Sequence, residues 1–215
     1  MSEELTTLRN LLADLNEEPF LQLVATQLAA GVDPLQIVEA CREGMTAVGT
    51  RFAAQEYFVS DLLVSAEIFN SAMKMIGPRL PARSESDSRL KVVFGTVQGD
   101  IHDIGKNLVI AMLSCSGCEV YDVGINTPPP VFIEKLRETG ATVLGLSGLL
   151  TTAYPSMAAT VKALVEADLR DKVKVMIGGG LVDDQVCAFV GADAWGHDAI
   201  EAVQLAKKLA GGPTR

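Results

Sequence analysis

The residues best suited to chemistry lie in one short segment, Gly99-Asp100-Ile101-His102-Asp103-Ile104-Gly105. This segment holds one of the two histidines of the 215-residue chain, with an aspartate on either side of it. A buried strand is expected just before it, at 90–96, and a helix just after it, at roughly 105–116. The sequence therefore places an imidazole beside carboxylates at the carboxyl end of a strand, an arrangement suited to acid–base or metal chemistry.

Three roles are open to His102. As a general base it would find a carboxylate partner in Asp100 or Asp103, but no nucleophile is placed beside it, because Ser147 lies on another loop without a G-x-S-x-G elbow. As a ligand in a metal site built by the protein alone it lacks companions, since His197 is the other histidine. As the axial ligand of a metal already held by a macrocycle, one histidine suffices. An aspartate two residues away can then hydrogen-bond the far ring nitrogen.

The elements expected after residue 89 alternate between strand and helix, which indicates an α/β domain with a doubly wound, five-stranded parallel sheet. Two of the strands are continuously apolar, as expected for a sheet that is covered on both faces. The expected strands are 90–96, 119–123, 142–147, 173–178 and 192–195. The expected helices are roughly 105–116, 130–139, 154–167, 182–190 and 198–209.

Three loops of this domain carry unusual residues at the carboxyl ends of strands, where open α/β sheets bind ligands. With the strand order 2-1-3-4-5, the first, third and fourth strands are neighbours and their loops converge. Glycines in these loops let the backbone approach a ligand, and hydroxyl groups supply hydrogen bonds. Neither G-x-G-x-x-G nor a Walker loop is present. The loops are 99–105, Ser147-Gly148-Leu149-Leu150-Thr151-Thr152 and Gly178-Gly179-Gly180.

The first part of the chain has helical periodicity and predicts a small bundle of four helices over 1–77. Apolar residues step by three and four, as at Leu62, Ala66, Phe69, Met73 and Ile76. Asp33 followed by proline predicts a helix start. The residues of that helix expected to point inward are Leu35, Val38, Met45 and Val48. A proline- and serine-rich stretch, 78–89, is expected to be a linker to a second domain at 90–215.

Composition narrows the classes of function. The net charge of −9 disfavours nucleic-acid binding, which needs clustered basic side chains. No apolar run approaches the roughly 18 residues that cross a membrane. The acidic start of the chain lacks the layout of a signal peptide, so we expect a cytoplasmic protein. Cys115 and Cys118 form a C-x-x-C pair without a second pair or a nearby histidine, and we expect buried, inert thiols there rather than a redox or zinc site.

The order and spacing of the three loops are similar to those of a known family. The pattern Asp100-x-His102-x-x-Gly105, 41 residues, Ser147-Gly148-Leu149, 28 residues and Gly178-Gly179 resembles the signature of cobalamin-binding Rossmann-like domains. Segments 44–52 and 56–63 resemble the helical cap that precedes this domain in methionine synthase and in corrinoid proteins of methyltransferase systems. The resemblance covers nearly the whole chain. It implies a four-helix cap followed by a Rossmann-like, flavodoxin-like sheet domain.

The resemblance also implies how the cofactor binds. Cobalamin or a related corrinoid, in its methylcobalamin form, would be held base-off/His-on, with His102 as the axial ligand of cobalt and Asp100 hydrogen-bonded to it. The dimethylbenzimidazole tail would insert along the sheet edge, and His197 would be a solvated loop residue. The expected contact residues are Gly99, Asp100, Ile101, His102, Asp103, Ile104, Gly105, Ser147, Leu149, Thr151, Gly178, Gly179, Gly180, Trp195, Gly196, Ala199 and, from the cap, Phe58 and Leu62.

Two positions need comment. In methionine synthase a second serine, six residues after the one matching Ser147, extends the His–Asp relay, and that position is Ala153 here. Either Thr152 substitutes for that serine or the relay ends at Asp100. In the cap, Phe58 and Leu62 would shield the upper face of cobalt, or they would pack in the core of the cap.

The function implied by the resemblance is that of a corrinoid methyl carrier that cycles between cobalt(I) and methylcobalt(III). A substrate:corrinoid methyltransferase would methylate the cofactor, and a corrinoid:acceptor methyltransferase would pass the methyl group to tetrahydrofolate or coenzyme M. A reductive reactivation protein is a further expected partner. Since 215 residues leave no room for a substrate-binding catalytic domain, we expect a carrier subunit rather than a complete enzyme. The alternatives are a cobalamin-dependent sensor, a mutase small subunit and a flavodoxin-like domain without a cofactor.

Overall fold

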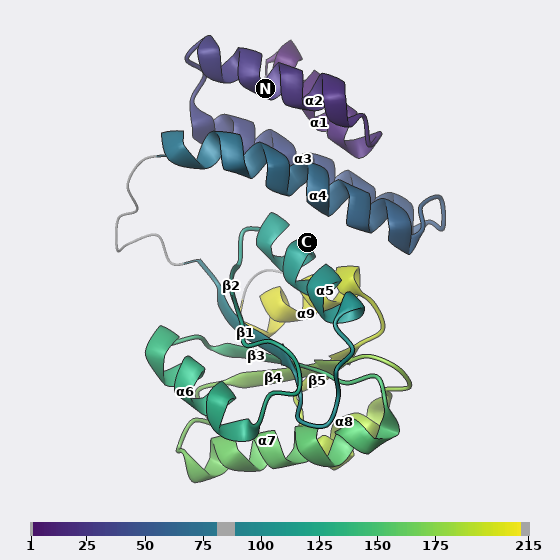
Figure 1. The fold of residues 1–215 in the computed structure, drawn as a ribbon, viewed down its shortest axis with the longest axis vertical. Helices are drawn as coiled ribbons and strands as arrows, with labels where there is room; N and C mark the ends of the chain where they lie inside the picture. Colours follow the sequence, from purple (N-terminus) through teal and green to yellow (C-terminus); the bar gives the residue numbers. More distant parts are fainter. Residues whose placement is uncertain (1, 81–88, 212–215) are drawn as a thin grey trace. The chain divides into compact units, whose positions relative to one another are not determined.

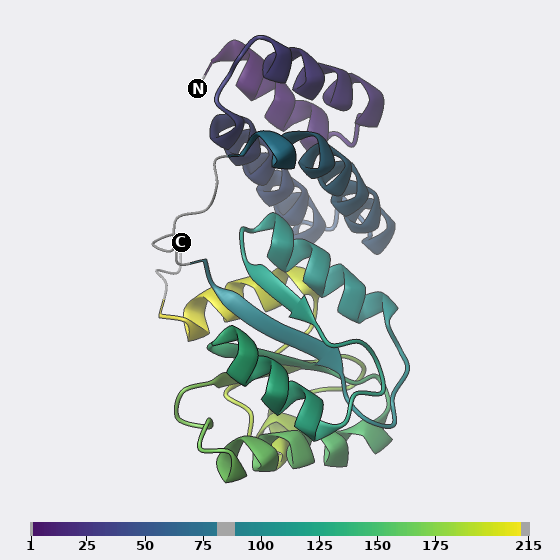
Figure 2. The same ribbon diagram turned by 60° about the vertical axis from the view of Figure 1, so that its left-hand side comes forward.

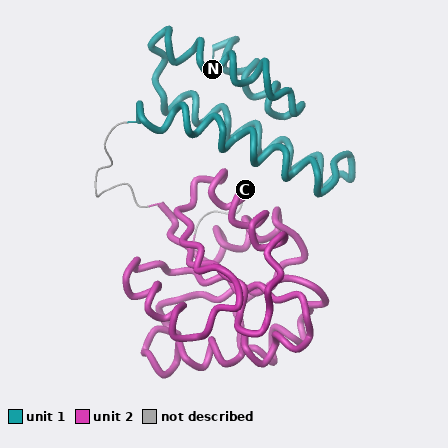
Figure 3. The backbone as a smooth tube through the Cα atoms, viewed as in Figure 1, with its two compact units in different colours: residues 1–88 teal, residues 89–215 magenta. Residues whose placement is uncertain are grey.

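The computed structural model describes residues 2–80 and 89–211 and divides the chain into two compact units, Met1–Ser88 and Arg89–Arg215 (Figure 3). The expected linker, 78–89, falls mostly on residues 81–88, which lie outside the described residues. Its first residues belong to a 3₁₀ turn, Gly77–Arg79. Each unit has its own buried core, and each is described by itself.

Unit 1 contains four α-helices in two layers, α1 with α2 and α3 with α4 (Figure 2). Side chains that accept hydrogen bonds from backbone N–H groups begin two of them, Ser2 for α1 and Asp33 for α3, as helix N-caps do. Fully buried apolar side chains such as Leu8, Phe20 and Ile68 fill the space between the layers. The helices are α1 (Glu3–Ala13), α2 (Glu17–Ala29), α3 (Pro34–Ala53) and α4 (Val59–Ile76). This arrangement confirms the expected bundle of four helices.

One inward position was wrong. Leu35 was expected to point into the bundle, but its side chain is 49% exposed. The buried stripe of α3 runs through Ile37, Cys41, Met45 and Val48 instead. Leu35 precedes Ile37 by two residues, about 200° around a helix, so it faces away from that stripe. Pro34 fixes where α3 begins, but the apolar residues from Ile37 onward determine which face of the helix is buried.

Unit 2 is a doubly wound α/β domain with a five-stranded parallel sheet in the order β2-β1-β3-β4-β5 (Figure 1). The predicted strand order is therefore confirmed. The strands are β1 (Lys91–Thr96), β2 (Glu119–Asp122), β3 (Val143–Ser147), β4 (Lys174–Gly178) and β5 (Ala194–Gly196). The two central strands, β1 and β3, are almost entirely buried, because helices cover both faces of the sheet.

The helices of unit 2 form two layers. Helices α5 and α9 cover one face of the sheet, and α6, α7 and α8 cover the other (Figure 1). Their bounds are α5 (Ile104–Cys115), α6 (Pro129–Thr139), α7 (Tyr154–Glu166), α8 (Asp184–Val190) and α9 (Ala199–Leu209), and a 3₁₀ turn at Thr151–Ala153 precedes α7. No helix in the part of the chain that the structure describes is both long and apolar enough to cross a membrane.

The carboxyl ends of four strands form one row. Thr96 pairs with Ser147, Ser147 with Gly178 and Gly178 with Gly196 across β1, β3, β4 and β5. A hydroxyl residue or a glycine occupies every position of this row, so the four strand ends themselves carry no bulky side chain. The three loops that were predicted to converge start from neighbouring strands, and their polar and glycine residues lie at or directly after the carboxyl ends of those strands.

Candidate functional site

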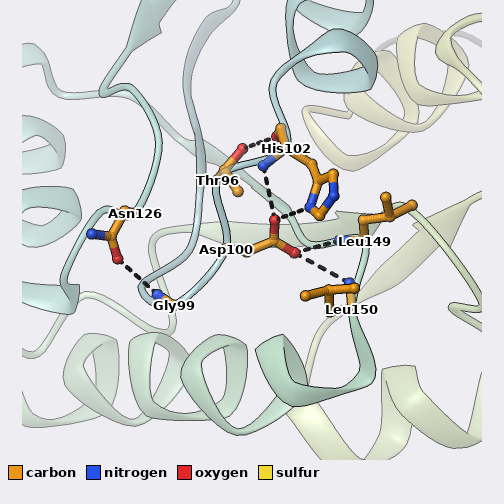
Figure 4. A network of polar contacts seen from close by, with 7 residues as sticks. All are labelled: Thr96, Gly99, Asp100, His102, Asn126, Leu149 and Leu150. Carbon is orange, nitrogen blue, oxygen red and sulfur yellow. Dashed lines mark hydrogen bonds and ion pairs between the residues drawn. The ribbon is translucent and has the colours of Figure 1, made fainter.

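His102 and Asp100 form a tight pair in the loop after β1 (Figure 4). The Nδ1 atom of His102 lies 2.6 Å from Oδ1 of Asp100, and the same oxygen accepts a hydrogen bond of 2.9 Å from the His102 backbone N–H. An ionised carboxylate only accepts hydrogen bonds, so in the neutral imidazole Nδ1 carries the proton and Nε2 keeps its lone pair. None of the described residues forms a hydrogen bond with Nε2, and the imidazole is 46% exposed. His102 therefore presents one free nitrogen lone pair to a ligand.

Asp100 is held on its other side by the loop after β3. Its Oδ2 atom accepts hydrogen bonds from the backbone N–H groups of Leu149, at 2.7 Å, and Leu150, at 3.2 Å, and its side chain is fully buried. Burial would raise the pKa of Asp100, but the hydrogen bonds from His102, Leu150 and Leu149 outweigh it and lower that pKa below its ordinary value. Asp100 is therefore an ionised carboxylate, and both of its oxygens accept hydrogen bonds from the protein.

The relay question has a structural answer at this carboxylate. Ala153 is buried and has no polar side-chain atom, and Oδ2 of Asp100 accepts from two backbone N–H groups. Thr152 is not among the donors to Asp100 within the described residues. The hydrogen-bonded chain from His102 therefore ends at Asp100, the second of the two expected possibilities.

Two residues outside the predicted set fix the backbone around His102. The Thr96 hydroxyl donates a 2.9 Å hydrogen bond to the His102 carbonyl, and Asn126 contacts Gly99 and Asp100 from the loop after β2 (Figure 4). Thr96 is fully buried at the end of β1, and such a position is a signal that sequence reasoning could have used. Asn126 is an exposed loop residue, and no pattern in the sequence singles it out.

The far end of the histidine loop is fastened by a buried cation. Lys106 lies in the first turn of α5, its side chain is 3% exposed, and its Nζ atom is 2.7 Å from a carboxylate oxygen of Asp122 at the end of β2. Nζ also donates a 2.7 Å hydrogen bond to Asn107. Since a buried ammonium is stable only when it is paired, this contact fixes the start of α5 against the sheet.

The glycines of the loop after β4 serve a close approach between two loops. A Cβ atom on Gly179 would lie 2.8 Å from the carbonyl oxygen of Gly148, and one on Gly180 would overlap the carbonyl oxygen of Leu149. Both glycines have left-handed backbone, with φ of +108° and +55°. The backbone approach expected at these glycines is therefore made to the loop after β3, whose N–H groups hold Asp100.

Exposed apolar side chains follow four of the five strands at this edge. They are 44% to 79% exposed, a state that usually marks a binding surface when several such residues gather. The loop after β1 contributes Ile101, and Ile104 begins α5 directly after that loop. The loop after β3 contributes Leu149 and Leu150, and Ile125 and Leu181 belong to the loops after β2 and β4. Such residues suit a large ligand with apolar faces better than a small polar substrate.

The remaining predicted residues lie as follows. Asp103, Gly105 and Thr151 are exposed, and Ser147 and Gly178 are half-buried at their strand ends. Trp195 is half-buried and donates a 2.7 Å hydrogen bond to Asp184, while the exposed His197 packs edge-on against it. Gly196 ends β5, and Ala199 is the buried first residue of α9. In unit 1, Phe58 is 71% exposed and Leu62 is fully buried.

The donor set excludes a metal site built from side chains alone in the residues described. No group of three or more histidine, cysteine, aspartate or glutamate side chains gathers there in a way that could hold an ion. Cys115 and Cys118 are buried where α5 ends and β2 begins, as expected for structural thiols. One directed imidazole beside exposed apolar side chains does fit a metal that a macrocycle already holds. Fold and site thus define a class, the doubly wound parallel α/β domains with a candidate binding site for a large cofactor at the carboxyl edge of the sheet.

Comparison with known proteins identifies the family. Two family models, each described as a B12 binding domain, match residues 90–204 and residues 4–76. The chain is 36% identical over 203 residues to trimethylamine corrinoid protein 1 of Methanosarcina acetivorans, covering 94% of each chain. It is 35% identical over 210 residues to a corrinoid protein of Desulfitobacterium hafniense, covering 96% of this chain and 97% of the relative. The chain belongs to the B12-binding family of corrinoid proteins that serve methyltransferase systems, and its cofactor is a corrinoid.

Solved structures agree with this assignment. A cobalamin-binding protein from Desulfitobacterium hafniense is 38% identical, with a TM-score of 0.79, and the match covers 95% of this chain and 98% of that one. A methanol:cobalamin methyltransferase complex from Methanosarcina barkeri gives a TM-score of 0.84 at 23% identity, over 100% of this chain and 82% of that one. The second match is evidence for the fold alone.

Proposed function

We propose that this protein is a methyl carrier that binds its corrinoid base-off/His-on and serves two methyltransferases. One partner, a substrate:corrinoid methyltransferase, loads the methyl group, and a corrinoid:acceptor methyltransferase removes it to tetrahydrofolate or coenzyme M. The observation that carries the proposal is the free Nε2 lone pair of His102, directed by the buried Asp100 carboxylate. The names of the relatives, methylamine corrinoid proteins matched over nearly their whole length, support the methyl-transfer part.

In this proposal His102 supplies the lower axial ligand. The bound corrinoid would supply a cobalt centre that accepts and releases the methyl group, and the protein would set its ligation and access. Asp100 keeps the Nδ1 proton in place, so Nε2 stays available and the imidazole becomes a stronger donor. The exposed apolar side chains beside it, such as Ile101 and Ile104, would contact the corrin ring.

The row of small residues at the carboxyl edge suits the nucleotide tail. Ser147, Gly178 and Gly196 follow one another across three strands, so a ligand could lie along them without meeting a bulky side chain. Thr151 and Trp195 would line the same path. The tail-binding role of this row is part of the proposal, together with the remaining predicted contact residues.

Unit 1 would serve as the cap. Phe58 is 71% exposed at the start of α4, and we propose it as the aromatic shield of the methyl group. Leu62 has no exposed surface, which favours its alternative role in packing the bundle. We further propose residues 1–77 as the cap domain, 78–89 as its linker and hinge, and 90–215 as the cobalamin-binding domain. A reductive reactivation protein completes the proposed set of partners.

The test of ligation compares the wild-type protein with His102→Gly and His197→Gly after reconstitution with cobalamin and removal of unbound cofactor. In the cobalt(II) state, paramagnetic resonance should show imidazole nitrogen coupling in the wild type and in His197→Gly, and none in His102→Gly. His197 is the matched control, because it is an exposed loop histidine in the same unit. With ¹⁵N-histidine-labelled protein, histidine nitrogen coupling that persists in His102→Gly would refute the ligand assignment, because the label separates histidine from the benzimidazole nitrogen of cobalamin. A folded wild-type protein that retains no corrinoid would refute the carrier proposal.

The test of methyl transfer uses the loaded wild-type protein. We expect the reduced protein to accept a methyl group from a cognate methyltransferase with methanol or a methylated amine, and to release it to coenzyme M or tetrahydrofolate when the second methyltransferase is added. The absorption spectrum should change at the first step and return at the second. Light-dependent spectral change without methyl turnover would instead indicate a sensor.

A further inference from the structure

Asn126 contacts the turn before His102 from outside the motif. It lies in the loop between β2 and α6, 27 residues away from its partner Gly99. Its Oδ1 atom accepts a 2.8 Å hydrogen bond from the Gly99 backbone N–H, and its own backbone N–H donates one of 2.9 Å to the Asp100 carbonyl. The two bonds bracket residues 99 and 100, so Asn126 defines the turn that delivers the Asp100 carboxylate to His102 (Figure 4).

Gly99 needs this support, because burial fixes Asp100 but does little to fix the glycine before it. Gly99 has left-handed backbone with φ of +87°, and a Cβ atom built on it would meet nothing within 4 Å. Ile101 and Ile104 on the following residues are 69% and 70% exposed. A glycine turn in open space has wide conformational freedom, so the direction of the His102 loop depends on its hydrogen bonds.

Asn126 is itself firmly placed. The next residue, Thr127, is 3% exposed, and its backbone N–H donates a 3.0 Å hydrogen bond to the Thr96 carbonyl at the end of β1. The Thr127 hydroxyl bonds the Val123 carbonyl at 3.0 Å. A continuous path of hydrogen bonds therefore runs from the edge of the sheet through Thr127 and Asn126 to the turn at Gly99.

Asparagine suits the two tasks of this position, which are to adopt the left-handed backbone and to accept a hydrogen bond from the Gly99 N–H. Asn126 has a φ of +49°, in the left-handed region that asparagine, aspartate and glycine tolerate better than other residues. Only asparagine and aspartate among these add a side-chain oxygen that can accept from Gly99. Glycine would keep the backbone conformation and the N–H bond to Asp100 while losing the acceptor, which separates the two tasks experimentally.

We propose that Asn126 is a positioning residue for the cobalt ligand, which acts by fixing the Gly99–Asp100 turn and thereby the orientation of the His102 imidazole. The inference rests on the proposed His-on binding of the corrinoid. It extends the ligand assembly beyond the recognised motif to the loop after β2, so that three neighbouring strands contribute to the placement of one imidazole.

The experiment compares Asn126→Gly, Asn126→Asp and Asp168→Gly. Asp168 is the matched control, since it is an exposed residue of the same unit with left-handed backbone, φ of +58°, in the loop between α7 and β4. In the cobalt(II) state, Asn126→Gly should lower the ratio of His-on to His-off protein by about 2-fold to about 10-fold, the effect of one hydrogen bond. Asn126→Asp, which keeps the acceptor, and Asp168→Gly should both retain the wild-type ratio.

A second readout needs no cofactor. Amide hydrogen exchange of the cofactor-free protein should accelerate at Gly99 and His102 in Asn126→Gly, and not in the two other variants. A wild-type His-on ratio and wild-type exchange in Asn126→Gly would overturn the inference. If the wild type itself shows no nitrogen coupling, the His-on proposal fails, while the exchange comparison still decides whether Asn126 holds the turn.

Discussion

Replacing Asp100 with asparagine is the sharpest test of the site, because the change is nearly isosteric and reverses the chemistry of the pair. Asp100 accepts four hydrogen bonds, from the N–H groups of Leu149 and Leu150 and from the backbone and ring of His102. An asparagine has a single side-chain oxygen, which can face either the two leucine N–H groups or His102, but not both. Facing the oxygen toward the two leucine N–H groups satisfies two donors, and its NH₂ group then points at His102.

That orientation changes which nitrogen of His102 carries the proton. The asparagine NH₂ donates to Nδ1, so the neutral imidazole must hold its proton on Nε2, the atom that would bind cobalt. To bind cobalt through Nε2, His102 must move its proton back to Nδ1. This breaks the hydrogen bond and places the Nδ1–H against the asparagine NH₂, at a cost of about 2 kcal/mol. The His-on to His-off ratio should therefore fall about 30-fold in Asp100→Asn.

Stability should fall as well. The His102 N–H loses its charged acceptor, worth about 2 kcal/mol, and the two leucine N–H groups exchange a charged acceptor for a neutral one, worth about 1 kcal/mol each. The sum, about 4 kcal/mol, is below the free energy of unfolding of a typical domain, so the variant should still fold.

The assay is the cobalt(II) resonance spectrum of the reconstituted protein, combined with a urea unfolding curve. Asp168→Asn is the matched control, since Asp168 is an exposed acid of the same unit outside the proposed contact residues, and asparagine tolerates its left-handed backbone. Wild-type nitrogen coupling in Asp100→Asn, in a protein with a wild-type unfolding midpoint, would refute the reasoning about the tautomer.

Three further outcomes are expected. The pKa of Asp100 is lowered in the folded state, so its contribution to stability is present above the ordinary aspartate pKa of about 3.9 and is lost as pH falls through the folded-state pKa. Unfolding midpoints at pH 7 and pH 3 should therefore differ more for the wild type than for Asp100→Asn. Gly180→Ala should lower the free energy of unfolding by about 2–5 kcal/mol, because the added Cβ overlaps the Leu149 carbonyl oxygen. Gly140→Ala, at a similar φ but in open space, should lower it by about 1–2 kcal/mol. Equal losses of the two variants in urea titrations would contradict this account. Burial raises the pKa of the Cys41 thiol to about 12, so iodoacetamide at pH 8 should modify Cys41 only after unfolding, and mass spectrometry that finds it modified in the native protein would disprove this.

The sheet was predictable from the sequence because its strands are short apolar runs separated by helical periodicity. The alternation of elements predicted a doubly wound parallel sheet, and the order β2-β1-β3-β4-β5, from which the convergence of the loops was expected, is the order in the structure. The pairing of Asp100 with His102 was also expected, since the two residues are only two positions apart. Local spacing thus carries much of the information about the centre of the site.

Contacts between distant loops could not be predicted in the same way. Asn126 has an ordinary residue type in an exposed loop, and its role depends on how that loop passes beside Gly99. The two leucine N–H groups that hold Asp100 are backbone atoms, so no side-chain pattern reveals them. Leu35 shows the converse error, because it was assigned to the buried face together with Val38, Met45 and Val48, although its side chain is exposed.

The close crossing of the loops after β3 and β4 has a consequence for protein engineering. Gly148 and Leu149 meet Gly179 and Gly180 backbone to backbone, so neither loop can gain or lose a residue without shifting the N–H groups that hold Asp100. The opposite edge of the sheet has no such constraint at Asp168, an exposed turn residue between α7 and β4. A reporter peptide or a surface tether belongs at that turn, where the ligand-bearing edge keeps its geometry.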